Sequence, residues 1–140
     1  MSVSSLAVDP ITAPPEVPIG DVAELMSTEE VGDVVIVKDD RPVGIVTDRD
    51  IALAVAEHGD ITELAAADVM SEDPATVSAD ADPLALPEEM AEERVRRIPV
   101  VDDGELVGIA TLDDLVATVG EELEDVATVI EAQSPGYSPS

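Results

Sequence analysis

The feature that most constrains the fold of this 140-residue chain is an internal repeat with an offset of 64 residues. Residues 9–57 align without a gap to residues 73–121, and 16 of these 49 positions are identical. The correspondence is clearest where Val43–Ile51 matches Val107–Leu115. A repeat of this size is one structural unit that packs against its neighbour, so we expect two similar units.

Each copy carries the patterns of the same five elements, in the order β-α-β-β-α. For the first copy we expect an extended start at 11–13, a helix near 20–28, strands at 34–37 and 43–46, and a helix at 48–57. The equivalent segments of the second copy are 75–77, 84–93, 98–101, 106–110 and the residues from 112 onward. Proline is tolerated in the first turn of a helix but not in its middle, so Pro87 predicts a helix start near Leu86. The sequence Asp102-Asp103-Gly104 is typical of a tight hairpin turn.

These elements divide the chain into two domains and two smaller segments. We expect the first domain at 8–60, a linking helix at 61–72, the second domain at 73–133 with an extended C-terminal helix, and a disordered tail at 134–140. The last helix carries apolar residues at helical spacing, which predicts either core packing or a dimer seam. These residues are Leu115, Val119, Leu123, Val126 and Ile130.

The composition is strongly acidic, with 33 acidic and 6 basic residues and a formal net charge of -27. Such a surface repels phosphate backbones and acidic membranes, so we expect no nucleic-acid or membrane partner. Self-repulsion of this size is relieved by salt, because molar salt shortens the screening length to about 3 Å. Together with a single Lys and the absence of Phe and Trp, this predicts a cytoplasm with molar salt, as in halophilic archaea.

The chain offers little for metal or covalent chemistry. It has no cysteine and one histidine, His58, so we expect neither a disulfide nor a transition-metal site. No leader pattern is present at residues 1–10, and no apolar run is long enough to span a bilayer, which predicts a cytoplasmic protein. No catalytic set or phosphate-binding glycine loop of the Walker type stands out. An enzyme that uses paired carboxylates is therefore the weakest hypothesis.

The motif Gly-hydrophobic-x-Thr-x-x-Asp occurs in both copies, at 44–50 and 108–114, and Arg97–Asp102 precedes the second occurrence. At these residues the chain resembles the CBS-domain family, specifically the tandem pair called a Bateman module, over nearly everything from Val8 to Glu122. The resemblance implies an α+β fold, with two β-α-β-β-α units related by a pseudo-two-fold axis and packed sheet to sheet. It also implies a regulatory module that binds AMP, ADP, ATP or S-adenosylmethionine in clefts between the units, with no tightly bound cofactor. A homodimer and a separate regulated protein chain are expected by the same resemblance.

The resemblance assigns roles within the two motifs. Thr47 and Thr111 are expected to meet phosphate, and Asp50 and Asp114 to accept hydrogen bonds from ribose hydroxyls. This agrees with elementary chemistry, because a helix N-terminus presents free N–H groups to an anion. Further candidate ligand-binding residues are glycines that allow close approach, apolar residues for an adenine slot, arginines for phosphate, and the repeated threonines of the extended starts. These residues are Gly44, Gly108, Val34, Val35, Ile98, Pro99, Arg49, Arg97, Thr12 and Thr76.

A second interpretation stays open, in which the module is a ligand-free dimerisation or scaffold unit. Thr-x-x-Asp at a helix start is close to a capping box, which stabilises a helix without binding anything. The basic residues, which lie in the two stretches 38–49 and 94–97, would then pair only with neighbouring acids. Cap and ligand contact are compatible, and Mg²⁺ accompanying ATP is a further possibility, since carboxylates suit hard cations.

The two copies differ in charge around the shared motif. Arg49 aligns with Asp113, Arg41 aligns with Glu105, and Asp33 aligns with Arg97. Asp113 next to Thr111 would repel phosphate unless Arg96 or Arg97 compensates. The sequence therefore predicts two clefts of unequal affinity, with one occupied site as the simplest outcome.

Overall fold

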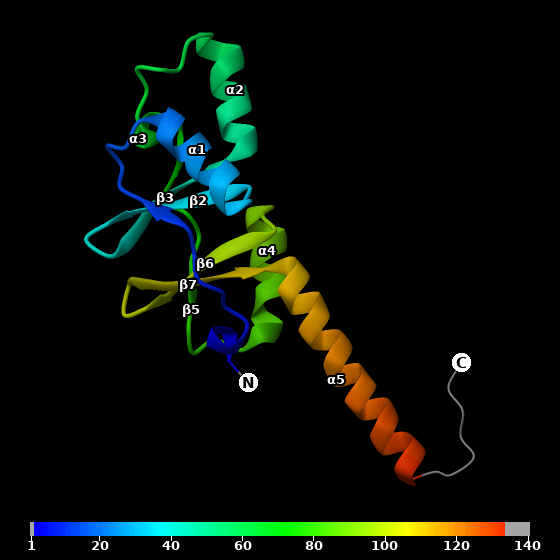
Figure 1. Ribbon diagram of the computed structural model, residues 1–140. Coiled ribbons are helices and arrows are strands. Elements are labelled where there is room, and N and C mark those ends of the chain that lie inside the picture. The colour runs from blue at the N-terminus through cyan, green and yellow to red at the C-terminus, as the bar shows by residue number, and fades with distance from the viewer. Residues whose placement is uncertain (1, 134–140) are drawn as a thin grey trace.

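The computed structural model describes residues 2–133 and contains the same succession of elements twice (Figure 1). Its first half contains η1 (Val3–Ser5), β1 (Thr12–Ala13), α1 (Ile19–Glu29), β2 (Asp33–Lys38), β3 (Arg41–Thr47), α2 (Asp48–His58), α3 (Ala66–Val69) and β4 (Ser71–Glu72). Its second half contains β5 (Val77–Ser78), η2 (Pro83–Ala85), α4 (Leu86–Glu93), β6 (Arg97–Asp102), β7 (Glu105–Thr111) and α5 (Leu112–Gln133). The expected order β-α-β-β-α is confirmed in both copies. The tail expected at 134–140 lies outside the described residues.

Two sheets of matching design form the centre of the molecule. In the first unit the strand order is β1-β2-β3-β4, and in the second it is β5-β6-β7. The central hairpins pair in the same register at the offset of 64, because Asp33 faces Thr47 as Arg97 faces Thr111. Both hairpins also shift register at the same place, after Ile36 and after Val100. The repeat in the sequence is therefore a repeat in the backbone.

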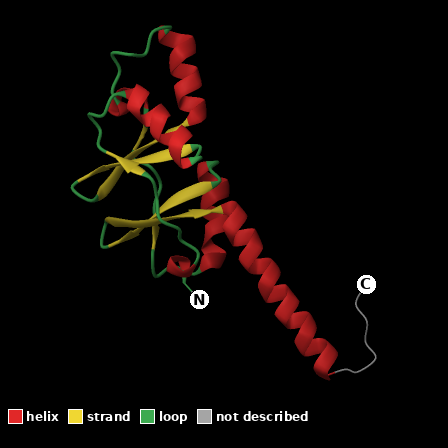
Figure 2. Cartoon of the chain, in the orientation of Figure 1, coloured by secondary structure: helices red, strands yellow, loops and turns green. Residues whose placement is uncertain are grey.

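The two sheets pack against each other, which confirms the expected α+β fold. Successive side chains of a strand point to opposite faces, so Val34 and Ile36 face the core of the first unit while Val35 faces the other way. Pro99, the counterpart of Val35, alternates with Ile98 and Val100 in the same manner. Val35 and Pro99 are buried although they belong to neither core cluster, as expected for side chains between the sheets. Figure 2 shows the sheets one above the other, with both hairpin turns on the same side.

Each core is completed by a segment from the far side of the repeat boundary. Val3 and Leu6, at the start of the chain, lie in the core of the second unit, and Val8 forms a bridge with Ile109 of β7. Ala66, which follows α2, lies in the core of the first unit. Figure 1 shows the N-terminal end of the chain beside the second unit. The segment that precedes each unit in the sequence therefore packs on the other unit.

The linking segment differs from the expected helix across 61–72. Only Ala66–Val69 is helical, and Ser71–Glu72 forms the edge strand β4. Asp60 accepts hydrogen bonds from the backbone and hydroxyl of Thr62, which holds a turn there. The segment follows the first sheet instead of leaving it, so a long helix has no room to form. The domain boundaries remain a prediction.

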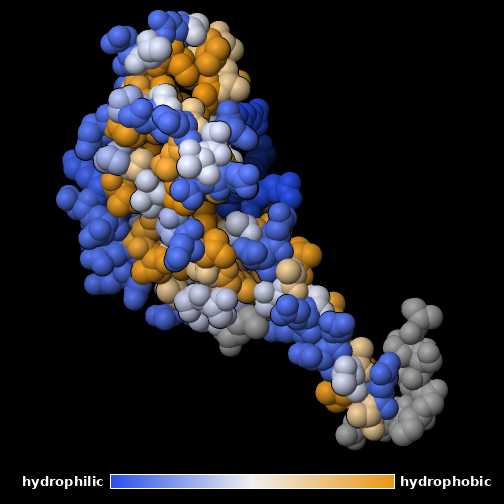
Figure 3. Space-filling model, viewed as in Figure 1, coloured by the Kyte–Doolittle hydropathy of each residue, from blue (hydrophilic) through white to orange (hydrophobic). Residues whose placement is uncertain are grey.

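The helices agree closely with the sequence expectations. α4 begins at Leu86 with Pro87 in its first turn, as proposed. α5 starts on the second unit and then extends away from both sheets (Figure 1). Hydrophilic residues cover much of the face seen in Figure 3, in keeping with the acidic composition. No helix in the described part of the chain is long and apolar enough to cross a membrane.

Candidate functional site

The junction between β3 and α2 is held by a complete capping box. The backbone N–H of Asp50 donates to Thr47 Oγ1 at 3.1 Å, and the backbone N–H of Thr47 donates to Asp50 Oδ2 at 2.9 Å. Two backbone donors at the helix start are thereby satisfied by side chains. Thr47 and Asp50 are thus fixed relative to each other at the positive end of an 11-residue helix.

The cap does not use all the hydrogen-bonding capacity of these two side chains. A threonine hydroxyl is both donor and acceptor, and the Thr47 hydroxyl only accepts in the cap. One carboxylate oxygen of Asp50 is likewise outside the cap. Capping and ligand contact are therefore compatible at this junction.

The equivalent junction between β7 and α5 carries half of this arrangement. The backbone N–H of Asp114 donates to Thr111 Oγ1 at 3.1 Å, and the described residues contain no return bond from Thr111 to the Asp114 carboxylate. In addition, Arg96 lies 3.3 Å from Asp113, the residue that aligns with Arg49. Both partners of this pair are largely exposed, so it adds little to stability.

A cleft of about 700 Å³ opens at the first junction, between the two units. It is lined from the first unit by the start of α2 and from the second unit by the segment that leads from α4 into β6, with the linking segment along one side. The lining residues are Gly32, Ile45, Thr47, Asp48, Arg49, Asp50, Ser71, Glu72, Asp73, Pro74, Ala75, Glu93, Arg94, Val95, Arg96 and Arg97. Four predicted ligand-binding residues therefore meet in one place: Thr47, Asp50, Arg49 and Arg97.

The cleft concentrates the positive charge of the protein. Four of the six basic residues line it, together with five of the 33 acidic residues. The rest of the chain holds two basic and 28 acidic residues. This is therefore the part of the surface where an anion meets the least repulsion.

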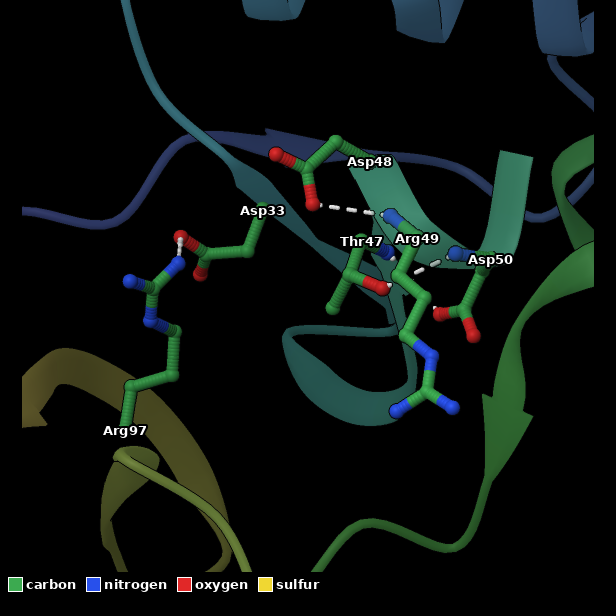
Figure 4. A network of polar contacts seen from close by, with 6 residues as sticks. All are labelled: Asp33, Thr47, Asp48, Arg49, Asp50 and Arg97. Atoms are coloured by element: carbon green, nitrogen blue, oxygen red, sulfur yellow. Dashed lines mark hydrogen bonds and ion pairs between the residues drawn. The ribbon is translucent and has the colours of Figure 1, made fainter. Parts of the chain in front are cut away.

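Arg97 crosses from the second unit to Asp33 of the first (Figure 4). Its Nη1 donates to Asp33 Oδ1 at 2.5 Å, and the Asp33 side chain is 14% exposed. Burial raises the pKa of the Asp33 carboxyl, and this effect exceeds the lowering by the Arg97 guanidinium. Because desolvation outweighs the attraction of its partner, the ion pair contributes little net stability.

Asp33 and Arg97 also occupy equivalent positions of the repeat, 64 residues apart. Equivalent residues meet only near the pseudo-two-fold axis that relates the two units. The pair therefore lies on this axis, where a relative movement of the units would change it. By contrast, the Arg49 side chain forms no ion pair with any described residue, and its guanidinium extends away from the helix start (Figure 4).

Arg94 lines the cleft from a backbone conformation that disfavours it. It ends α4 with φ of 57°, in the left-handed region, and its counterpart Glu30 ends α1 with φ of 55°. Glycine is the usual residue at such a helix end, and other residues pay about 1 kcal/mol. A costly residue that faces the cleft is a candidate for function.

Replacing Arg94 with Gly is expected to change stability and anion binding in opposite directions. The free energy of unfolding should rise by about 1 kcal/mol, because glycine relieves the left-handed strain. Binding of a phosphate-bearing ligand should weaken, because a cation leaves the cleft. Glu30→Gly is the matched control, since it relieves the same strain outside the cleft. Chemical denaturation and calorimetric titration measure both effects, and equal affinities for the two variants would exclude a role for Arg94.

The positions equivalent to the four cleft arginines are not basic. They are Asp113 for Arg49, Glu30 for Arg94, Gly32 for Arg96 and Asp33 for Arg97. Three of these four equivalent positions are therefore acidic, and Arg96 pairs with one of them, Asp113.

Several other predicted site residues lie away from the cleft. Val34 and Ile98 face the cores of their own units, and Val35 and Pro99 lie buried between the sheets. Thr12 and Thr76 are exposed but outside the lining. Thr111 and Asp114 belong to the second junction. A ligand in the cleft would contact none of these side chains in the present conformation.

The two motif glycines make room for the chain itself. A Cβ on Gly44 would collide with the Met70 side chain, and a Cβ on Gly108 would lie 2.7 Å from the Cβ of Ala7. Met70 and Ala7 belong to the segments that each unit receives from across the repeat boundary. In this structure, the atoms that come close to the backbone at these two glycines are therefore those of the two segments.

Sequence reasoning missed the apolar side of the cleft. The apolar residues on this side are Ile45, Val95, Pro74 and Ala75. Pro74 and Ala75 belong to the segment that we expected mainly to begin the second domain. The offset of 64 equates residues 71–75 with 7–11, which indicates that this segment belongs to the repeat. Among residues 2–133 no group of acidic or histidine side chains is arranged to hold a metal ion.

Comparison with known proteins agrees with this architecture. The family model described as CBS domain matches residues 3–57 and 66–121. An uncharacterised protein of Methanopyrus kandleri is 37% identical over 126 residues, which cover 83% of this chain and 64% of that protein. The chain thus spans less than two thirds of the length of this relative.

Two solved structures share the fold over most of their length. The CBS domain protein PAE2072 of Pyrobaculum aerophilum, complexed with AMP, has a TM-score of 0.74 and 30% identity, with 81% of this chain and 89% of that chain covered. The CBS-domain pair of protein MJ0100, in complex with 5′-methylthioadenosine and S-adenosyl-L-methionine, has a TM-score of 0.75 and 27% identity, with 87% and 98% covered. Two copies of one α+β unit, with a cleft at a capped strand–helix junction, are the features of a tandem pair of CBS domains. The chain belongs to the CBS-domain family.

Proposed function

We propose that this protein is a regulatory module that binds one anionic adenosine nucleotide, such as AMP, ADP or ATP, in the cleft at Thr47 and Asp50. The observation that carries the proposal is the gathering of four of the six basic residues around the N-terminus of α2. AMP in the Pyrobaculum relative and the adenosyl compounds in the MJ0100 pair support the adenosine part of the ligand.

The cleft offers a contact for each part of such a ligand. The Thr47 hydroxyl and the guanidinium groups of Arg49 and Arg97 suit the phosphate, since arginine binds phosphate through paired donors. The carboxylate oxygen of Asp50 that the cap leaves free suits a ribose hydroxyl. The apolar residues Ile45 and Val95 suit the base without aromatic stacking.

The ion pair between Arg97 and Asp33 provides a route from binding to regulation. A phosphate that draws Arg97 away from Asp33 breaks a contact on the axis between the units. The carboxylate left behind is partly buried and favours a rearrangement that exposes it. Binding would thereby change the relative position of the two sheets, which a separate regulated protein can detect.

The second junction is proposed to take no anionic nucleotide. Asp113, Glu30 and Asp33 stand where the first junction has arginines. S-adenosylmethionine carries a positive charge and is therefore a weaker candidate for the first cleft than AMP or ATP. Mg²⁺ accompanying ATP, a cytoplasm with molar salt in a halophilic archaeon, and a homodimer remain predictions from composition and resemblance.

Isothermal titration calorimetry in 2 M KCl tests the proposal. AMP, ADP, ATP and S-adenosylmethionine are titrated separately, and we expect one nucleotide per chain. Thr47→Ala should weaken binding, whereas Thr111→Ala should not, although each removes a cap worth about 1 kcal/mol. No heat with any of the four ligands would favour the ligand-free scaffold. Two equal sites would contradict the charge argument.

A further inference from the structure

The first three backbone N–H groups of α2 all have acceptors within the protein, and one of these acceptors differs from the other two. The N–H of Asp48 donates to the carbonyl of Gly32 at 3.0 Å, and the N–H of Asp50 donates to Thr47 Oγ1 at 3.1 Å. The N–H of Arg49 donates at 2.8 Å to Asp48 Oδ1, which belongs to the carboxylate of the preceding residue. A helix start presents N–H groups to an anion, and here an anion of the chain itself already holds one of them.

Of these three bonds, the one between Arg49 and Asp48 is the easiest to break without disturbing the fold. The carbonyl of Gly32 belongs to the backbone just before β2, and Thr47 belongs to the capping box at the end of β3. Asp48 is exposed, so a change of its side-chain rotamer can withdraw the carboxylate from the Arg49 N–H. This N–H is therefore the donor of the helix start that a ligand can take over.

The second junction has the same bonds except the one made by a carboxylate. Its first and third bonds match those of α2, with the N–H groups of Leu112 and Asp114 as the donors. Leu112 aligns with Asp48, and no described side chain accepts from the N–H of Asp113. A helix therefore begins at this kind of junction without such a carboxylate, so the start of α2 does not require the one of Asp48.

The Asp48 carboxylate also lies beside the space between the two units (Figure 4). Its Oδ2 is 3.4 Å from the point that a Cβ on Gly32 would occupy, and Arg97 Nη1 is 3.7 Å from the same point. Burial is the main cause that raises the pKa of the Asp33 carboxyl, and the negative charge of Asp48 raises it further. The charge of Asp48 therefore acts on the same part of the cleft in which Arg97 and Arg49 are proposed to hold a phosphate.

We therefore propose that Asp48 is a competing anion built into the cleft, which determines how tightly the cleft binds phosphate. In the ligand-free protein its carboxylate holds the Arg49 N–H, and a phosphate must displace this carboxylate and then remain beside its charge. Asp48 thereby sets the nucleotide concentration at which the cleft fills, and so the range over which the module responds. Because it acts on phosphate binding, this role of Asp48 rests on the function proposed for the cleft.

Calorimetric titration of AMP and of adenosine into Asp48→Asn in 2 M KCl tests this role. The amide keeps the shape and the acceptor oxygen of the side chain and removes its charge. AMP should bind about 5-fold more tightly than to the wild type, since part of a repulsion between unit charges persists inside a cleft at high salt. Adenosine has no phosphate and should bind both proteins equally. Asp21→Asn is the matched control, because it removes the same charge from the first turn of α1, outside the cleft, and it should leave both affinities unchanged.

The possible outcomes separate the role of Asp48 from the function of the cleft. An AMP affinity that is unchanged or weaker in Asp48→Asn would overturn the role of Asp48 and leave the proposed function standing. An equal gain for AMP and adenosine would also overturn it, because the effect would then be unrelated to phosphate. Binding of neither ligand to any of the three proteins would overturn the proposed function, and the role of Asp48 with it.

The backbone amide of Arg49 gives a second readout, which does not depend on a variant. In nitrogen-15 correlation spectra of the wild type, saturation with AMP should move the Arg49 resonance, because the acceptor of its N–H changes from a carboxylate to a phosphate. Saturation with adenosine should leave this resonance in place. An Arg49 resonance that AMP leaves in place, while those of Thr47 and Asp50 move, would contradict the proposed displacement of Asp48.

Discussion

Replacing Arg49 with Asp is expected to weaken AMP binding by at least about 30-fold, which corresponds to about 2 kcal/mol. The substitution reverses a charge at the helix start, where the ligand phosphate would lie. Two unit charges 5 Å apart interact by about 3 kcal/mol at an effective dielectric constant of 20, and salt reduces this value. The fold should tolerate the change, because an acidic residue in the first turn of a helix is favourable. The second unit already has Asp113 at this position.

Lys38→Asp is the control for this prediction. It introduces the residue that the second unit carries at the equivalent position, Asp102, and it changes the net charge by the same amount. Lys38 does not line the cleft. Calorimetric titration of AMP into both variants in 2 M KCl should show a loss for Arg49→Asp alone. Equal losses would mean that the overall charge of the protein, and not the cleft, governs binding.

Raising KCl from 0.1 M to 2 M is expected to increase the melting temperature by on the order of 10 °C. The formal net charge of -27 makes the compact state repel itself. At 0.1 M salt the screening length is about 10 Å, so acidic side chains on neighbouring elements repel one another, whereas above 1 M it falls below about 3 Å. Thermal denaturation followed by circular dichroism at several KCl concentrations measures this effect.

A variant with fewer charges provides the comparison for the salt experiment. Changing Glu121, Glu124, Asp125 and Glu131 to the corresponding amides reduces the net charge from -27 to -23 and leaves the cleft untouched. Its melting temperature should rise less with KCl than that of the wild type. A melting temperature that does not change with KCl would show that repulsion does not limit stability, and it would remove the basis for proposing a molar-salt cytoplasm.

The order and limits of the elements were predictable because they depend on local patterns. Val34–Val37 is a run of β-branched residues, and the structure extends it by one residue at each end to Asp33–Lys38. Pro87 determined the start of α4 through the geometry of one residue. The turn at Asp103 and Gly104 has positive φ at both residues, 52° and 81°, as a tight hairpin requires.

The cleft was only partly predictable, because its lining depends on how distant segments meet. Thr47 and Asp50 were recognisable as a pair three residues apart. That Arg97 reaches Asp33 depends on the position of the pseudo-two-fold axis, which the sequence does not define. Val34 and Ile98 were assigned to a ligand slot because they are apolar, but an apolar strand residue fits a core equally well. The burial of a side chain decides between a core position and a ligand slot, and this burial depends on the tertiary fold.

The placement of the first residues in the second unit also sets an order of folding. The first unit needs nothing beyond its own strands and the segment up to about Glu72, so it can close while the rest of the chain is still being synthesised. The second unit must wait for β7, because Val8 pairs with Ile109, which lies 101 residues further along the chain. Contacts between residues so distant form slowly. Until then Val3 and Leu6 lack most of the core that they enter.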